Sequence, residues 1–124
     1  MFDSFFKNTN RYNSKLNRID LTDDGQIEDI LSLSNDKPVL LFKHSSRCGV
    51  SSMVLKRFES KIETIHENYN YFILDIIKYR SLSNSLAKKF SVQHESPQLI
   101  IIDNGEVTYH DSHYGIMDVV LKSE

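Results

Sequence analysis

One cysteine, Cys48, lies in a segment whose residue types suit thiol chemistry, residues 43–51 with the sequence KHSSRCGVS. An apolar run over residues 39–42 precedes this segment and a helical pattern follows it, so Cys48 is expected at a strand–helix junction. The unpaired N–H groups and positive dipole end of a helix start favour the thiolate over the thiol. Arg47 and His44 are expected to add positive charge. The pattern predicts a reactive cysteine rather than a small buried hydrophobic residue.

The spacing from Cys48 to Ser51 is that of a Cys-x-x-Cys redox motif in which serine replaces the second thiol. A lone thiolate can attack a disulfide and become part of a mixed disulfide. Because the chain has only one cysteine, an external thiol must resolve that adduct. Ser51 is a candidate hydrogen-bond donor to the Cys48 thiolate. An ordinary place in the first turn of the helix explains it almost equally well.

Short apolar runs predict the strands that must position Cys48. They extend over residues 16–21, 39–42, 71–77, 99–102 and 107–110. Asn104-Gly105 between the last two runs is a strong hairpin signal. Asp75, inside the third run, is interpreted as the end of a strand.

Apolar residues at helical spacing predict four helices between and after these runs. The first begins near the candidate caps Thr22 and Asp23 and ends before Pro38. The other three are marked by Val50, Val54, Phe58, Ile62 and Ile65, by Leu82, Leu86 and Phe90 after a cap at Ser81 or Ser83, and by Ile116, Val119 and Val120 after a cap at Ser112.

This order of elements predicts an α/β fold. The first three strands, each followed by a helix, require parallel pairing through right-handed crossovers, and the hairpin adds an antiparallel edge. We expect a thioredoxin-like, three-layer α/β/α sandwich with a mixed parallel/antiparallel sheet. The 124 residues are the usual size of one domain, predicted over residues 1–124, with residues 1–14 as an N-terminal extension.

A second signal is Ser96-Pro97 at the start of the fourth strand, where proline is tolerated because it begins the run. In the thioredoxin-like fold a cis proline at this position faces the active-site cysteine. The residue before it pairs with the backbone of bound substrate. An X-Pro pair alone says little, but together with the Cys-x-x-Ser helix start it supports a redox site that includes Ser96 and Pro97.

Composition and charge argue against several other classes of function. Fifteen Lys and Arg against seventeen Asp and Glu give a net charge of −2, which does not suit a dedicated nucleic-acid-binding domain. No apolar run approaches the ~20 residues of a membrane-spanning helix. Phe2, Phe5 and Phe6 are expected to pack on the body rather than anchor it to a membrane. The single cysteine favours a reducing compartment, so we expect a soluble, cytoplasmic protein.

Several segments, in order, resemble the monothiol bacilliredoxins, the YtxJ-type general stress proteins. Residues 43–51 are similar to the active-site segment of that family, and residues 79–84, 94–98, 104–107 and 112–116 to other characteristic stretches. The likeness extends from about Leu16 to the C-terminus. The family usually has threonine and proline where this chain has Arg47 and Gly49.

The resemblance implies an enzyme, a monothiol thiol-disulfide oxidoreductase that removes bacillithiol, a low-molecular-weight thiol, from S-bacillithiolated client proteins. It implies Cys48 as the nucleophile and Pro97 as the cis proline opposite it, with Ser51 in the place of a resolving cysteine. Bacillithiol or another small thiol would be the co-substrate, and S-thiolated proteins would be the partners.

Two other functions remain open. A non-catalytic thioredoxin-fold module would hold an extended client segment beside Pro97, and the lack of a second cysteine favours it. The His44-x-x-x-Cys48 spacing also occurs in glutaredoxin-linked arsenate reductases, although Ser52 stands where those enzymes have an arginine. The five histidines have no cysteine or tight carboxylate cluster around them, so we expect no metal site.

Overall fold

The computed structural model describes residues 16–121. The predicted N-terminal extension and the three phenylalanines in it lie outside the described residues. Among residues 16–121, no helix combines the length and the apolar character needed to cross a bilayer.

Five strands form one mixed sheet in the order β1-β3-β2-β4-β5. Their bounds are β1 Arg18–Asp20, β2 Val39–His44, β3 Asn70–Asp75, β4 Gln98–Asp103 and β5 Glu106–Ser112. Strand β3 pairs in parallel with β1 and β2, whereas β4 is antiparallel to both β2 and β5. Strand β3 ends at Asp75, the residue interpreted as a strand end, and so stops two residues before the end of the predicted run over residues 71–77.

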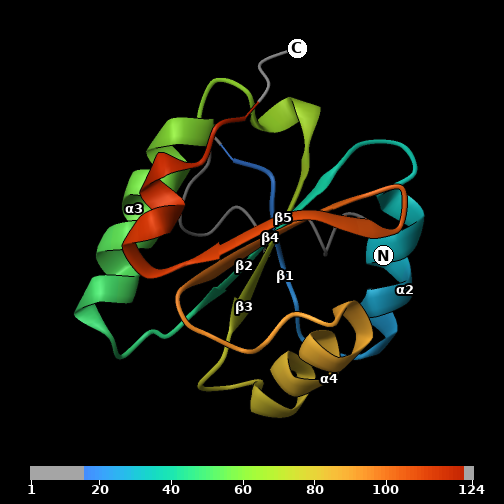
Figure 1. The fold of residues 1–124 in the computed structure, drawn as a ribbon, viewed down its shortest axis with the longest axis horizontal. Coiled ribbons are helices and arrows are strands. Elements are labelled where there is room, and N and C mark those ends of the chain that lie inside the picture. The colour runs from blue at the N-terminus through green and yellow to red at the C-terminus, as the bar shows by residue number, and fades with distance from the viewer. Residues whose placement is uncertain (1–15, 122–124) are drawn as a thin grey trace.

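Helices cover both faces of the sheet. The α-helices are α2 Gly25–Leu33, α3 Gly49–Ile62 and α4 Arg80–Phe90, and the short 3₁₀ helices are η1 His66–Asn68 and η2 His113–Asp118. Figure 1 shows α3 on one side of the sheet, and α2 and α4 on the other. The α/β fold with three layers is therefore confirmed.

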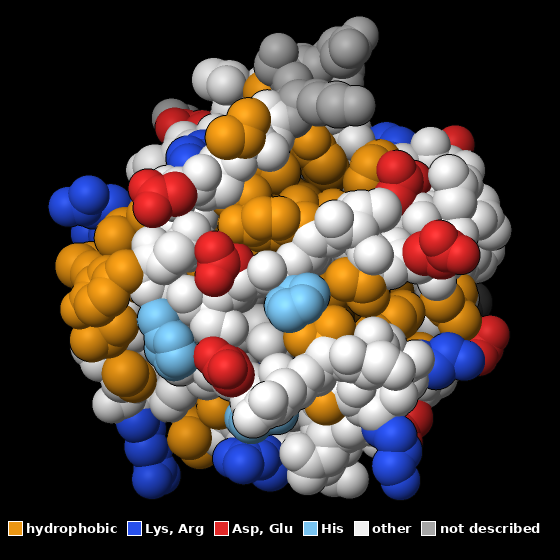
Figure 2. All heavy atoms as spheres, in the orientation of Figure 1, with side chains coloured by type: hydrophobic (Ala, Val, Ile, Leu, Met, Phe, Trp, Pro, Cys, Tyr) orange, Lys and Arg blue, Asp and Glu red, His pale blue; other side chains and the backbone are white. Residues whose placement is uncertain are grey.

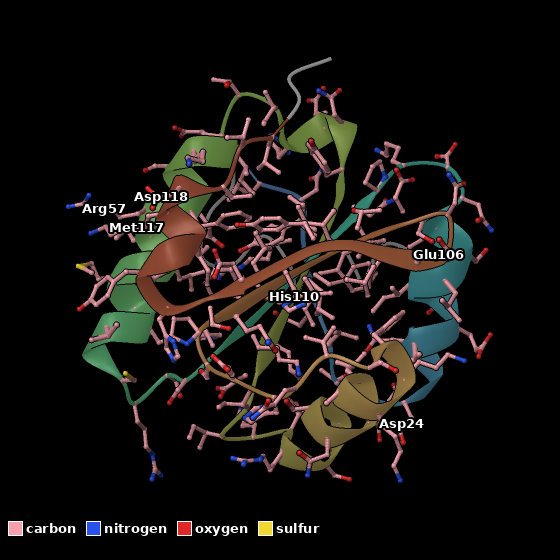
Figure 3. The ribbon with its side chains drawn as sticks, in the orientation of Figure 1. Asp24, Arg57, Glu106, His110, Met117 and Asp118 are labelled. Atoms are coloured by element: carbon pink, nitrogen blue, oxygen red, sulfur yellow. The ribbon has the colours of Figure 1, made fainter. Side chains whose placement is uncertain are left out.

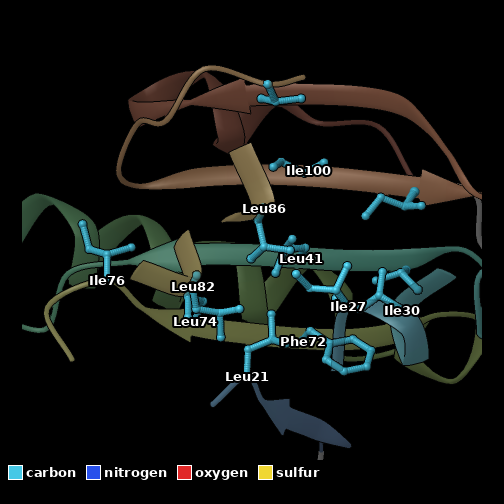
Figure 4. Packing of buried hydrophobic residues seen from close by; sticks show 13 residues of the cluster. Leu21, Ile27, Ile30, Leu41, Phe72, Leu74, Ile76, Leu82, Leu86 and Ile100 are labelled. Carbon is cyan, nitrogen blue, oxygen red and sulfur yellow. The ribbon is translucent and has the colours of Figure 1, made fainter. Parts of the chain in front are cut away.

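Strands β2 and β4 are buried on both faces, which explains their continuous apolar sequence. Leu41 of β2 faces the cluster under α2 and α4 that Figure 4 shows, together with Phe72 and Leu86. Its neighbours Leu40 and Phe42 face the cluster under α3 instead. Alternate residues of one strand thus hold two helical layers on one sheet.

Local hydrogen bonds explain the helix start and the hairpin that the sequence predicts. The backbone N–H groups of Thr22 and Asp23 donate to Gln26 Oε1 at 2.7 and 3.2 Å, just before α2. In the β4–β5 turn, Asn104 and Gly105 have φ values of 52° and 79°, the left-handed conformation of a type I′ hairpin. Gly105 N–H also donates to Ser34 Oγ at 2.9 Å, which ties the hairpin to the end of α2.

Three helix predictions are wrong in detail. The last helix, η2, is a 3₁₀ helix, and Val120 beyond it is 93% exposed. Gly115 in η2 lies against Asp111, four residues earlier, whose carboxylate would be 2.6 Å from an added Cβ, so this position has no room for a larger side chain unless Asp111 moves. Helix α4 is preceded by Tyr79, and Ser83 is buried instead of capping.

The predicted apolar face of α3 is also too long at both ends. Val50 is exposed although it fits the spacing, whereas Ser51 in the same turn is fully buried. Ile65 lies after the helix, which ends at Ile62. Val54, Phe58 and Ile62 are buried as predicted.

Candidate active site

Cys48 is the N-cap residue of α3. Strand β2 ends at His44, and a short loop leads to Cys48, whose backbone is extended with φ −109° and ψ 121°. Its carbonyl accepts the first helical hydrogen bond, from Ser52 N–H at 3.0 Å, and its own N–H donates to Ser45 O at 3.2 Å. The thiol is free and partly exposed. It therefore lies at the leading end of a 14-residue helix, where unpaired N–H groups favour an anion.

Ser51, three residues later, is fully buried and holds the loop in place. Its Oγ accepts a hydrogen bond from Ser45 N–H at 3.0 Å. No hydrogen bond joins Ser51 to Cys48 in the described part of the chain. The geometry supports the role in the first helical turn over a direct role at the sulfur.

Replacing Ser51 with alanine is expected to lower the free energy of unfolding by about 1–2 kcal/mol, because the Ser45 N–H loses its partner in a partly buried loop. Urea denaturation of the wild type and the variant checks this. Ser52→Ala is the matched control, because Ser52 is an exposed serine on the same helix. Equal stability of wild type and Ser51→Ala would contradict the loop-holding role.

The two basic residues near Cys48 differ in their contribution. Arg47 is exposed and has no ion pair with any residue from 16 to 121. His44 is half-buried, and burial lowers its pKa, although Asp75 opposes this shift. An imidazole with a lowered pKa is mostly neutral at pH 7. Burial therefore reduces the positive charge that His44 contributes near Cys48, whereas Arg47 is an exposed guanidinium group next to Cys48 in the chain.

The Ser96–Pro97 peptide bond is cis. Lys43 near the end of β2 pairs with Gln98 at the start of β4. The loop after His44 and the proline loop, which contains Ser96 and Pro97, therefore lie at the same end of the sheet. Pro97 is buried, and its carbonyl accepts a hydrogen bond from His113 N–H at 2.9 Å. Cys48 follows β2 and Ser96-Pro97 precede β4, so these residues lie at the same end of two neighbouring strands.

A buried polar cluster that the sequence analysis missed lies behind this end of the sheet. Lys43 is 0% exposed, and its Nζ donates to Ser83 O at 3.4 Å. Ser83 Oγ shares a hydrogen bond of 2.9 Å with His94 Nδ1. Burial and the nearby Arg80 lower the pKa of Lys43 to about 8. Lys43 directly follows the apolar run in β2, and this position was the available signal for its burial.

A cleft of about 350 Å³ opens beside the Cys48 loop. Its walls come from the carboxyl ends of β1, β2 and β3, from the first residues of the α3 region and from the turn before α4. The lining residues are Asp20, Leu21, Thr22, His44, Ser46, Ser52, Ile73, Asp75, Lys78 and Tyr79. In open α/β sheets, ligands bind at the carboxyl ends of the strands.

An apolar groove lies at the opposite end of the sheet from Cys48, and β5 forms one edge of the sheet. Figure 2 shows apolar side chains gathered in a hollow above β5, where Tyr69, Tyr109 and Leu121 line a groove at the amino ends of β2 and β3. Figure 3 shows His110 near the middle of β5. Within residues 16–121, no group of three or more His, Cys, Asp or Glu side chains is arranged to hold a metal ion.

Solved structures with this fold include oxidoreductases. A candidate oxidoreductase with a thioredoxin fold is 28% identical, with a TM-score of 0.70 and coverage of 90% of this chain and 89% of that chain. Schistosoma mansoni thioredoxin is 23% identical, with a TM-score of 0.63 and coverage of 82% and 87%. Thioredoxin O2 from Arabidopsis thaliana is 16% identical, with a TM-score of 0.65 and coverage of 82% and 86%. The two thioredoxins show the shared fold alone.

The family comparison is more specific than the fold. The family model of monothiol bacilliredoxin BrxC matches residues 19–121. This range contains the Cys48 loop, the cis Ser96–Pro97 bond and every strand after β1, and it covers most of the chain. With its single cysteine at the start of α3, this chain belongs to the monothiol bacilliredoxin family.

Proposed function

We propose that this protein is a monothiol thiol-disulfide oxidoreductase that uses Cys48 to remove bacillithiol from mixed disulfides on client proteins. Family membership and the thioredoxin fold support a redox function. The observation that carries the proposal is one partly exposed thiol at the N-cap of α3, at the same end of the sheet as the cis Ser96–Pro97 bond.

The proposed cycle has two exchange steps. The Cys48 thiolate attacks the bacillithiol sulfur of the mixed disulfide, a new S–S bond forms, and the client thiolate leaves and takes up a proton. A second bacillithiol thiolate then attacks the bacillithiol sulfur of the adduct and releases bacillithiol disulfide and the Cys48 thiolate. In sum, the client disulfide is reduced to a thiol while two bacillithiol molecules are joined.

Each neighbouring residue has a separate proposed task. The first N–H groups of α3 and the Arg47 guanidinium stabilise the thiolate of Cys48. Ser51 holds the loop through its hydrogen bond with Ser45. Because Ser51 stands where a resolving cysteine would be, the mixed disulfide on Cys48 must be reduced by bacillithiol. The backbone of Ser96, fixed by Pro97, is the proposed contact for an extended client segment. S-thiolated proteins in the cytoplasm are the proposed partners.

Exposure to the disulfides of bacillithiol, glutathione and cysteine in turn tests the proposal. Intact-mass spectrometry should show one adduct mass per chain, formed fastest with bacillithiol, and none on Cys48→Ser. An adduct of the same mass on the serine variant would contradict the assignment of Cys48. If client binding persisted in Cys48→Ala and no adduct formed on wild type, the protein would be a binding module instead.

The arsenate reductase alternative has less support. Ser52, an exposed residue that lines the cleft, stands where those enzymes have an arginine. A serine hydroxyl has no positive charge with which to hold an oxyanion.

A further inference from the structure

We propose that the cleft beside Cys48 binds the polar, non-sulfur part of the small thiol, and that Lys78 pairs with a carboxylate of that molecule. The proposal rests on the function proposed above. It adds a site for the small thiol that is distinct from the proposed client contact at Ser96 and Pro97. The cleft has a volume of about 350 Å³. This is near the lower end of ligand sites, which span about 300–1,000 Å³, and so it suits a small molecule.

The position of the cleft fits a ligand joined to Cys48. Ser46 and Ser52 line it, and they lie two residues before and four residues after Cys48 in the chain. Ser52 N–H also donates to the Cys48 carbonyl at 3.0 Å. A disulfide bond is only about 2 Å long, so the atoms beyond the sulfur of a captured thiol must lie close to this loop.

The chemistry of the lining suits a hydroxylated, charged ligand. Thr22, Ser46 and Ser52 offer hydroxyl groups that donate and accept hydrogen bonds. Lys78 is exposed at the cleft and has no ion pair with any other residue in the range 16–121. Its ammonium group is therefore available to an anionic ligand.

The acidic side of the cleft offers a complementary partner. Asp75 ends β3 beside His44, and one of its carboxylate oxygens, Oδ1, accepts the Ile77 N–H at 2.9 Å. A carboxylate has about four acceptor positions, so Asp75 retains capacity for an ammonium or hydroxyl group of the ligand. Asp20 is a second carboxylate in the lining. A cysteine-derived thiol that carries both an amine and a carboxylate matches a cleft with these two acidic residues and the Lys78 ammonium group.

The sheet order separates this cleft from the proline loop. The cleft is built at the ends of β1, β3 and β2, whereas Ser96-Pro97 precedes β4 on the other side of β2. Cys48 follows β2 and so lies between them. A mixed disulfide could then place its small thiol in the cleft and its protein segment along the proline loop at the same time.

The test compares Lys78→Glu with Lys88→Glu, which makes the same charge change at an exposed lysine of α4 away from the cleft. Two probes are used, bacillithiol disulfide, which carries carboxylates, and the neutral hydroxyethyl disulfide. The rate of adduct formation on Cys48 is measured by intact mass. Lys78→Glu should react with bacillithiol disulfide about tenfold more slowly and with hydroxyethyl disulfide at the wild-type rate, because charge reversal removes an attraction and adds a repulsion. Lys88→Glu should match the wild type with both probes.

Three results would overturn the cleft assignment. The first is an unchanged rate of Lys78→Glu with bacillithiol disulfide. The second is equal slowing with both probes, which would mean that Lys78 acts on the thiol itself. The third is equal slowing by Lys88→Glu, which would reflect overall charge. Failure of the wild type to form any adduct would contradict the proposed function instead, so the two failures are distinguishable.

Discussion

Replacing Lys43 with methionine is expected to stabilise the protein by about 2 kcal/mol at pH 7. Lys43 is 0% exposed, and the only hydrogen bond of its ammonium group within residues 16–121 is the long one to Ser83 O at 3.4 Å. Burial, with a smaller contribution from Arg80, lowers its pKa from 10.5 to about 8. A shift of this size corresponds to a cost of about 3 kcal/mol for keeping the charge in the folded state. Methionine has a similar length and carries no charge.

The pH dependence distinguishes this explanation from better packing alone. Below pH 8 both the folded and the unfolded lysine are protonated, and the full cost is present. As pH rises from 8 towards 10.5, the folded protein loses the proton first, so the wild type gains stability. Urea denaturation should therefore show a gap between Lys43→Met and wild type that shrinks from pH 7 to pH 10.

An exposed lysine supplies the control for this prediction. Lys88→Met should change the free energy of unfolding by no more than about 0.5 kcal/mol at either pH. A Lys43→Met variant that is less stable than the wild type at pH 7 would contradict the cost assigned to the buried ammonium group.

Replacing Glu59 with glutamine is expected to have the opposite effect, a loss of about 3 kcal/mol. Glu59 on α3 accepts hydrogen bonds from the Arg18 guanidinium of β1 and from Tyr71 OH of β3, the latter at 2.7 Å. The Arg18 and Glu59 side chains are only 10% and 11% exposed. Glutamine keeps the shape but removes the negative charge beside a buried guanidinium group, which is a costly change. Chemical denaturation at pH 7 measures the loss.

The double variant Arg18→Met/Glu59→Gln is the control for that result. Removing both charges should recover a large part of the stability lost by Glu59→Gln alone, since the buried positive charge is gone. A single variant within 0.5 kcal/mol of the wild type would show that the ion pair does not hold α3 against the sheet. This attachment matters for function because α3 carries Cys48 at its first turn.

The arrangement of the sheet was predictable because its signals are local and repeated. The apolar runs of β2 and β4 are buried on both faces, and their short length and β-branched residues favour a strand over a buried helix. Asn104 and Gly105 form the hairpin turn because both adopt positive φ angles, which these residue types favour. The ends of helices were less predictable, since exposed Val50 has the same spacing as buried Val54.

Features that depend on tertiary contact could not be read from the chain. The last helix is a 3₁₀ segment that packs against α3, a contact between distant parts of the chain that no periodicity encodes. The environment of Lys43 depends on α4, 40 residues away in sequence. The lowered pKa of His44 likewise follows from the burial of its ring rather than from its neighbours in the sequence.

The candidate site was predictable in its position and less so in its details. Cys48 is at the start of a helix because an apolar strand and a helical pattern flank it, and the structure places it at the N-cap. The cis geometry at Pro97 was expected from the thioredoxin-like fold and from resemblance to the bacilliredoxins, and not from the Ser-Pro pair alone. Ser51 bonds to Ser45 rather than to the sulfur, a choice that depends on the path of the loop.

The most direct measurement follows the small thiol from a client protein to Cys48. A purified protein carrying one bacillithiol mixed disulfide is mixed with this chain, and the intact masses of both are recorded over time. The client should lose one bacillithiol adduct while the wild-type chain gains one, and Cys48→Ser should neither gain the adduct nor speed its loss from the client. Loss of the adduct from the client at the same rate with Cys48→Ser would contradict the proposed role of this thiol.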